Sequence, residues 1–384
     1  MSANAKYDVV VIGAGVFGAW TASFLQRSGR RVLILDAYGP ANSRASSGGE
    51  SRIIRMGYGP DELYTRWSMR SLLAWEEFDA ATNSRIFHRT GVLWLSPPDN
   101  LYTRQSLEVL KRVGVPVEVM TVDDIRRRYP QIWVPDDACA FLETTSGALM
   151  ARRAVELVVA ETVRRGASYL TGAVEPPKGR GRLQSVHTRS GEQFSAETFV
   201  FACGPWLPAV FPRFLGGRIF PTRQEVFFFG VPAGDARFLP PSLPTYLDRF
   251  HDFYGMPNLE SRGLKAACDE HGTPANPDSQ ERVPTTEAMA RARKYVAERF
   301  PALNDAPVVE TRVCQYENTS SGDFLIDRHP DFLNVWLVGG GSGHGFKHGP
   351  ALGEYVTGRI DQGGPIEPRF SLATKQTIQA RAVF

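Results

Sequence analysis

The feature that most constrains this chain is a glycine-rich segment close to its N-terminus. The run YDVVVI at Tyr7–Ile12 is rich in β-branched residues and is typical of a buried parallel strand. It leads into Gly13-Ala-Gly15-Val-Phe-Gly18, after which apolar residues recur at helical spacing. A second apolar run follows at Arg31–Ala37. The segment therefore predicts a strand, a tight turn, a helix and a parallel strand, which together form a βαβ unit.

The three glycines have distinct physical roles in a dinucleotide-binding turn. Gly13 permits the tight turn, Gly15 lets the backbone approach a pyrophosphate, and Gly18 allows the helix to pack closely on the strand. Free N–H groups at the start of the helix face the phosphates. Asp36 stands at the end of the second strand, where a carboxylate accepts hydrogen bonds from ribose hydroxyls. The motif predicts a dinucleotide, and by itself it leaves NAD and FAD as alternatives.

The size and charge of the chain narrow the class of protein. Its 384 residues suggest two domains or more. The 44 Lys and Arg against 41 Asp and Glu give a net charge of +3, which is small for a nucleic-acid-binding protein. There is no apolar run of about 18 residues that predicts a membrane span. The polar residues 1–6 lack the apolar core of a secretory signal, and residues 381–384 match no targeting address. We therefore expect a cytoplasmic enzyme that binds neither nucleic acid nor membranes.

Hydrophobic periodicity predicts further elements along the chain. An aromatic-rich sheet with long loops is expected between residues 211 and 277, which are dense in Phe, Tyr, Pro and Gly. Signals for βα units lie at both ends of the chain, with sheet-like sequence between them. This order predicts interleaved domains. The predicted strands are 87–96 (with a central turn), 168–170, 183–188, 198–202 and 334–338, and the predicted helices are 121–129, 150–166, 285–300 and 349–359.

Two further motifs carry cations next to glycines. In SSGGESRIIR, Arg52 and Arg55 are three residues apart and can meet a phosphate or a carboxylate bidentately. The alternative is a solvated basic surface. In VGGGSGHGFK, a strand runs into a glycine-rich loop and then a helix, which is a second anion-facing turn ending at Lys347. The alternative is a tight connection with an exposed lysine.

The cysteines and histidines carry less information. The four cysteines, Cys139, Cys203, Cys268 and Cys314, form no C-x-x-C pair, so neither a zinc knuckle nor a disulfide scaffold is expected. A lone cysteine such as Cys314 is usually a small buried hydrophobe. His344 and His348 are four residues apart but have no third ligand nearby, so no metal site is predicted.

Taken together, these motifs resemble the flavin-dependent amine oxidases of the D-amino acid oxidase superfamily. Within it, the resemblance is greatest to the branch of the monomeric sarcosine oxidases and N-methyltryptophan oxidases, and it runs over nearly the whole chain. Five places carry it: GAGVFG with Asp36, SRIIR with a following Tyr-Gly, ACGPW at Ala202–Trp206, GLK at Gly263–Lys265, and VCQY with SGHGFK.

The resemblance implies a cofactor and its surroundings. It implies FAD rather than NAD, and it implies that Cys314 carries the flavin through a thioether. Lys265 falls where the family places a basic residue over the flavin that promotes reaction with oxygen, since a fixed cation stabilises superoxide. Arg52 falls where the family places an arginine beside the flavin. The turn near the flavin pyrimidine, where a helix dipole stabilises the reduced ring, corresponds to Ser342, Gly343, His344, Gly345 and Phe346.

The resemblance also implies a substrate site. Arg55 and Lys347 fall where the family holds the substrate carboxylate, and Tyr254 and Tyr316 match tyrosines of the substrate pocket. Asp269 stands where sarcosine-type enzymes carry a histidine, four residues beyond the lysine. It either favours a substrate with an extra cation or faces away.

A second departure lies in the segment before SRIIR. Ser46, Ser47 and Gly48 stand in a segment where the family has a histidine. The loss of imidazole there and the gain of a carboxylate at Asp269 should change the preferred amine, so sarcosine itself is not assured as the substrate.

These expectations combine into one prediction of fold and function. The fold is α/β, with a Rossmann-like FAD-binding domain (1–85, 145–210 and 310–384) interleaved with a mixed antiparallel-sheet substrate domain (86–144 and 211–309). The activity is an oxidase of N-methyl or other secondary amino acids, in which hydride passes to the flavin and O₂ is reduced to H₂O₂. The alternatives are an oxidase of primary or glycated amino acids, an amine dehydrogenase with another acceptor, and a non-catalytic nucleotide-binding protein. The partners are a small-molecule amine and O₂, and the protein is a monomer or a weak homo-oligomer.

Overall fold

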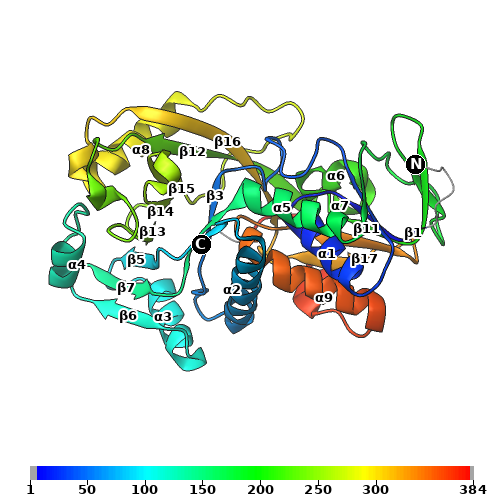
Figure 1. Ribbon diagram of the computed structural model, residues 1–384, viewed down its shortest axis with the longest axis horizontal. Helices are drawn as coiled ribbons and strands as arrows, with labels where there is room; N and C mark the ends of the chain where they lie inside the picture. Colours follow the sequence, from blue (N-terminus) through cyan, green and yellow to red (C-terminus); the bar gives the residue numbers. More distant parts are fainter. Residues whose placement is uncertain (1–6, 381–384) are drawn as a thin grey trace.

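Two large β-sheets and the helices around them form the molecule, and the computed structural model describes residues 7–380. Residues 1–6 and 381–384, on which the targeting expectations rest, lie outside this range. In Figure 1 one sheet lies in the right half of the view and the other in the left half, with the long strands β12 (Ile219–Phe229) and β16 (Val308–Thr319) leading from one half toward the other.

The first sheet is the Rossmann-like one, and its order is β17-β18-β11-β1-β2-β9, with β10 paired to β11. The strands from β18 to β9 run parallel, whereas β17 and β10 are antiparallel to their neighbours. Val9, Val10 and Val11 of β1 are all buried, as expected for a parallel strand that is covered on both faces. The strands are β1 (Tyr7–Ile12), β2 (Val32–Asp36), β9 (Ser168–Thr171), β10 (Ser185–His187), β11 (Gln193–Phe201), β17 (Leu325–Arg328) and β18 (Val335–Gly339).

Three helices pack together against this sheet, namely α1 (Val16–Arg27), α5 (Ala151–Arg164) and α9 (Gly349–Gln362). The apolar face of α1 is buried, and Trp20 is 1% exposed. A glycine lets α9 approach closely, because a Cβ atom on Gly353 would lie 2.6 Å from the backbone carbon of Trp20. Two helices more than 300 residues apart in the sequence, α1 and α9, therefore lie side by side.

The second sheet is mostly antiparallel, and its order is β16-β12-β15-β14-β13-β5-β7-β6. The one parallel pair among these strands is β13 with β5. Its core is aromatic, and the ring of Tyr295 on α8 (Thr286–Arg299) stacks on Phe253 at 4.1 Å. The remaining strands of this sheet are β5 (Val92–Ser96), β6 (Val117–Met120), β7 (Cys139–Glu143), β13 (Thr245–Asp248), β14 (Phe253–Met256) and β15 (Leu264–Cys268).

A small third sheet is formed by strands that lie, in the sequence, between strands of the two large sheets. It has the order β3-β8-β4 and consists of β3 (Ser51–Ile54), β8 (Gly147–Met150) and β4 (Phe87–His88). Strand β3 contains Arg52 and places the predicted SRIIR motif next to a strand almost 100 residues further along the chain. Within the described residues, no helix is both long and apolar enough to cross a bilayer.

Most predicted elements are present with boundaries shifted by a few residues. The predicted strand at 87–96 is divided into β4 and β5 at its turn. The predicted helix at 121–129 is α4 (Val122–Arg128), which begins with a capping box between Thr121 and Asp124. The predictions omitted α2 (Glu62–Thr82) and α3 (Leu101–Val113). The buried face of α2 includes serines and a threonine, so the sequence lacks the apolar periodicity that would have predicted this helix.

The sheets take their strands from alternating parts of the chain, as the predicted fold class requires. The strands of the first sheet come from 7–36, 168–201 and 325–339, and the eight-stranded sheet comes from 92–143 and 219–319. The α/β class with a Rossmann-like part and a second, mixed antiparallel part is confirmed. The proposed domain boundaries remain a prediction, and β16 crosses the one placed at residue 310.

Candidate functional site

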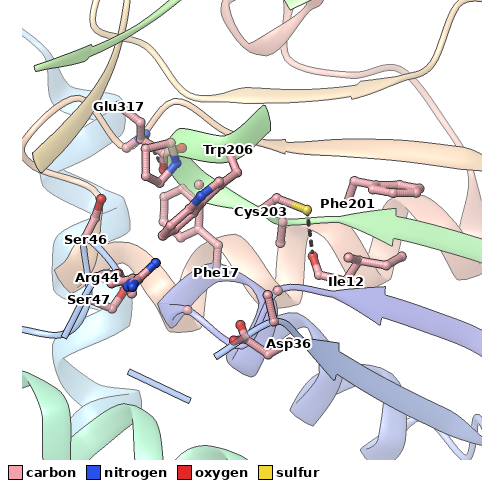
Figure 2. Close-up of a pocket in the computed structure, with 18 of the residues that line it drawn as sticks. Ile12, Phe17, Asp36, Arg44, Ser46, Ser47, Phe201, Cys203, Trp206 and Glu317 are labelled. Atoms are coloured by element: carbon pink, nitrogen blue, oxygen red, sulfur yellow. Dashed lines mark hydrogen bonds between the residues drawn. The ribbon is translucent and has the colours of Figure 1, made fainter. Parts of the chain in front are cut away.

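A cavity of about 490 Å³ lies at the carboxyl ends of the parallel strands. This is where ligands bind in open α/β sheets, because the strand order reverses there. Its lining combines both glycine-rich turns, the ACGPW segment and the SSGGESRIIR loop. Figure 2 shows that residues from these segments surround one space, among them Phe17, Asp36, Ser47, Cys203 and Trp206.

The first glycine turn is shaped by close backbone packing. Gly13 has a φ of +108°, and a Cβ atom there would lie 2.3 Å from the carbonyl oxygen of Ala202. A Cβ atom on Gly18 would lie 1.9 Å from the carbonyl oxygen of Gly13. Gly15 is different, since its nearest neighbour would be the Ser47 hydroxyl at 3.5 Å and it lines the cavity. The space in front of Gly15 therefore suits a ligand, whereas Gly13 and Gly18 are required by the protein itself.

The start of α1 is not capped by the side chain of its own N-cap residue, Gly15. Instead, the backbone N–H of Val16 donates to Ser47 Oγ at 3.0 Å. The Asp36 carboxylate accepts backbone N–H groups from Ala14 at 2.7 Å and from Tyr38 at 2.9 Å. Burial raises the pKa of Asp36 against the effect of these hydrogen bonds. Asp36 thus braces the turn and also lines the cavity.

The second glycine turn forms the opposite wall. Ser342, Gly343, Gly345 and Phe346 line the cavity, and Ser342 and Gly343 have positive φ values of 45° and 77°. His344 does not line it. Its ring is 3.2 Å from the Tyr58 hydroxyl and 2.9 Å from the carbonyl oxygen of Gly322. The imidazole of His344 therefore has a structural environment, and only its backbone belongs to the predicted turn.

The residues present fit a dinucleotide. The cavity joins a helix start without a side-chain cap from its own N-cap residue, a glycine that leaves open space and a carboxylate at the end of β2. These are the donors and the acceptor that such a cofactor requires. The lining of the cavity also includes Arg52 and Phe346. Two buried oxygen atoms of its lining, Ser46 Oγ and Glu317 Oε2, have no hydrogen-bond partner among the described residues.

Arg52, Lys265 and Cys314 come together at the Arg52 end of this cavity. Arg52 Nη2 is 3.7 Å from Cys314 Sγ and donates to the carbonyl oxygen of Ser46 at 2.6 Å. Lys265 is 2% exposed, and its Nζ donates to the carbonyl oxygen of Ser51 at 2.8 Å. Burial, followed by the charge of Arg52, lowers the pKa of Lys265 well below its usual range. Three distant motifs thus converge on one place, and Cys314 is a free thiol there.

Arg55 and Lys347 form a second buried group of cations. Each is 4% exposed. The Arg55 guanidinium lies 4.6 Å from the ring centre of Tyr58 and 5.3 Å from that of Trp94, and it donates to the carbonyl oxygen of Gly57. Lys347 Nζ donates to the Tyr58 hydroxyl at 2.6 Å. Tyr58 therefore holds both predicted carboxylate-binding cations.

The predicted pocket residues Tyr254, Tyr316 and Asp269 belong to the same region. Burial raises the pKa of Tyr254 to about 12 and that of Tyr316 well above its usual range, so both keep their protons at neutral pH. Burial also raises the pKa of Asp269, and the charge of Arg55 opposes this rise. The Asp269 carboxylate therefore shares its surroundings with the cations, although it does not touch the cofactor cavity.

Sequence reasoning missed several residues that support these groups. Ser47 holds the start of α1, and Tyr58 bridges to His348 Nε2 at 2.7 Å. Glu143 accepts the N–H groups of Met56 and Gly57, which positions the segment after SRIIR. Tyr58 belongs to the Tyr-Gly pair that follows SRIIR, so the sequence could have indicated it. Glu143 and Glu317 belong to no local pattern, because their partners are distant in the sequence or absent from the chain.

Comparisons with known proteins agree with this geometry. The family described as "FAD dependent oxidoreductase" (DAO) matches residues 8–359. Monomeric sarcosine oxidase of Bacillus sp. (strain B-0618) is 29% identical over 367 residues, which cover 92% of each chain. N-methyl-L-tryptophan oxidase of Escherichia coli O127:H6 is 29% identical over 360 residues, 91% of this chain and 93% of that protein. The crystal structure of L-proline dehydrogenase from P. horikoshii superposes with a TM-score of 0.82 at 20% identity, covering 96% of this chain and 97% of that one.

Proposed function

We propose, on the premise that this chain belongs to the DAO family of FAD-dependent oxidoreductases, that it oxidises the C–N bond of N-methyl or other secondary amino acids with O₂ as the electron acceptor. The observation that carries the proposal is the convergence of Arg52, Lys265 and Cys314 at one end of the cofactor cavity, with Arg55 and Lys347 buried nearby. The names of the two relatives, a sarcosine oxidase and an N-methyltryptophan oxidase, support the same substrate class.

The cavity suits FAD, with Gly15 and the start of α1 toward its phosphates and Asp36 toward a ribose. When bound, FAD supplies the ring that takes two electrons from the amine. The protein's contribution is to hold the substrate against that ring and to keep water out.

Arg55 and Lys347 are proposed to bind the substrate carboxylate. Both are charged donors in a buried place, where a charged hydrogen bond contributes about 1.5–3 kcal/mol. Tyr58 fixes the Lys347 ammonium through its hydroxyl and the Arg55 guanidinium through its ring. If the carboxylate is bound in this way, the amine end of the substrate remains available to react at the flavin.

Tyr254 and Tyr316 act in this proposal as hydrogen-bond donors and as walls of the pocket. Their raised pKa values exclude a role as proton acceptors at neutral pH. The described residues of the pocket offer no evident strong base, which agrees with an amine that is bound in its neutral form.

Lys265 is proposed to promote the reaction with oxygen. Burial disfavours the ammonium form of Lys265, whereas negative charge beside it in the cavity favours that form. We therefore expect Nζ to be protonated when negative charge accumulates there. A fixed cation in such a place stabilises the charge that develops when O₂ accepts an electron. Cys314 is proposed to carry the flavin covalently.

Asp269 is proposed to set the substrate preference. Its carboxylate is half-buried and interacts electrostatically with Arg55 and Lys347. An amino acid with an additional cationic group would satisfy that carboxylate while its own carboxylate meets the two cations.

A substrate panel with peroxide detection tests the function. N-methyl amino acids should give H₂O₂ in air at higher kcat/KM than the matching primary or glycated amino acids. Faster turnover of the primary or glycated compounds would replace the proposed substrate class. Turnover with an artificial acceptor but no peroxide would indicate a dehydrogenase, and no turnover with any amine would indicate a non-catalytic flavoprotein.

We also propose that the protein is cytoplasmic and is a monomer or a weak homo-oligomer. The name of its relative, monomeric sarcosine oxidase, supports the monomer. Light scattering of the purified holoenzyme measures the mass directly.

A further inference from the structure

Glu317 is a buried acid in the wall of the cofactor cavity. It lies on β16, three residues beyond Cys314, and is 7% exposed. Figure 2 shows it among the labelled residues that line the cavity, which include Phe17 and Trp206. Its Oε1 atom accepts the backbone N–H of Gly341 at 3.3 Å. Its Oε2 atom is buried without a hydrogen-bond partner among the described residues.

The chain leaves room for this carboxyl group by placing glycines around it. A Cβ atom on Gly339 would lie 3.3 Å from Oε2, and one on Gly341 would lie 3.3 Å from Oε1. A Cβ atom on Gly204 would lie 3.7 Å from Oε2. The glycines come from β18, the second glycine turn and the ACGPW segment, so three parts of the chain enclose one side chain.

No cation compensates the acid. Among the described residues, no ion pair includes Glu317, and the glycines next to its carboxyl oxygen atoms carry no charge. An isolated buried carboxylate is costly, and burial raises the pKa of Glu317 to about 7 against two backbone hydrogen bonds. The other titratable side chains that line the same cavity are Asp36, Tyr38, Arg44, Arg52, Arg189, Cys203, Asp278 and Tyr316, and no hydrogen bond joins any of them to Glu317.

We propose that Glu317 is a further FAD-binding residue, whose carboxyl group donates a hydrogen bond to an oxygen atom of the cofactor. Glu317 lines the same cavity as Gly15, Val16 and Phe17 at the start of α1. The carboxyl group therefore faces the space that the cofactor would occupy. A neutral acid can donate to a cofactor oxygen there, whereas an ionised one would repel the phosphate charge.

The consequence is a pH-dependent hold on the cofactor. FAD selects the protonated form of Glu317, so binding raises the pKa of this acid further, and the hold weakens when the pH rises through that value. Between about pH 6 and about pH 9.5, we expect the dissociation rate of FAD to rise about ten-fold, which corresponds to a change of one pKa unit.

The test compares Glu317→Gln and Glu317→Ala in a Cys314→Ala holoenzyme, where no thioether can retain the flavin. Free FAD is followed by its fluorescence after dilution. Glu317→Gln keeps a donor without a charge, so its dissociation should be slow and independent of pH. Glu317→Ala should release FAD rapidly at every pH. Asp278→Asn is the matched control, because Asp278 lines the same cavity but donates nothing and accepts from Trp206 at 2.8 Å. This control should keep the pH dependence of the parent.

A parent rate that does not change with pH would overturn the proposal, and so would a Glu317→Gln variant that changes as the parent does. If the Cys314→Ala protein loses FAD during purification, infrared spectroscopy of the otherwise unchanged holoenzyme decides. A band of a protonated carboxyl group should be present near neutral pH and absent in Glu317→Gln. Identical spectra of the two proteins would refute the assignment. Neither measurement uses turnover, so the outcome is independent of the proposed amine substrate.

Discussion

Lys265 Nζ lies 2.8 Å from the carbonyl oxygen of Ser51, although 214 residues separate the two in the chain. This hydrogen bond joins β15 of the eight-stranded sheet to β3 of the small sheet. Because Arg52 follows Ser51, the bond also places the lysine beside the arginine and the Cys314 thiol. One contact between sheets therefore assembles the group of residues on which the proposed chemistry depends.

Replacing Lys265 with methionine should slow the reaction of the reduced enzyme with oxygen. The loss of a fixed charge at a site of developing charge costs on the order of 10²–10³ in rate. Rapid mixing of reduced holoenzyme with O₂ measures this step apart from amine oxidation. Lys375→Met is the matched control, since Lys375 is also buried but does not line the cavity. Unchanged reoxidation in Lys265→Met would remove the proposed role.

Acid precipitation tests the covalent flavin. The yellow colour should remain with the precipitated wild-type protein and move to the supernatant for Cys314→Ser, because serine cannot form the thioether. Cys203→Ser serves as a control, since Cys203 lines the same cavity and its thiol contacts the carbonyl oxygen of Ile12. Release of colour from the wild-type protein would refute the linkage but not the binding of FAD.

Removal of Arg55 should discriminate between acids and esters. For Arg55→Ala, KM should rise for an amino acid substrate by the equivalent of ~1.5–3 kcal/mol, and much less for its methyl ester. Arg312→Ala, which removes an arginine paired with Glu50 by an ion pair, should change neither value. Equal losses on the acid and the ester would mean that Arg55 stabilises the pocket and does not bind the carboxylate.

Asp269→Asn should alter the choice of amine. If the carboxylate meets a second cation of the substrate, kcat/KM for cationic amino acids should fall by about 10–100-fold relative to neutral ones. The ratio of the two values is the measurement, because a general loss of pocket structure would lower both together. A ratio that equals that of the wild type would show that Asp269 does not contact the substrate.

Alanine at Gly15 and at Gly18 should have different consequences. A Cβ atom on Gly15 makes only an ordinary contact with Ser47, so the protein should fold normally but bind FAD at least about ten-fold more weakly. Gly18→Ala would force a Cβ atom to 1.9 Å from a backbone oxygen and should lower the stability by about 1–3 kcal/mol or more. Thermal unfolding with and without added FAD separates the effects. Equal destabilisation by both variants would contradict the assignment.

The βαβ unit, the roles of its glycines and the resemblance to FAD-dependent amine oxidases could be predicted from the sequence, because each rests on residues that are close in the chain. The sequence also indicated that the domains interleave, since the βα signals stand at both ends. Helix α2 was not predicted, because small polar residues occupy part of its buried face.

Which residues lie in contact could be seen only in the folded protein. The structure showed that Arg52, Lys265 and Cys314 lie together, that Tyr58 holds Arg55 and Lys347, and that His344 turns its ring away from the cavity. It also showed that Glu317 is a buried acid whose Oε2 atom has no hydrogen-bond partner within residues 7–380. These relationships depend on the pairing of strands far apart in sequence and on the absence of water around a side chain. Neither leaves a local pattern in the chain, because burial and electrostatic environment are properties of the folded whole.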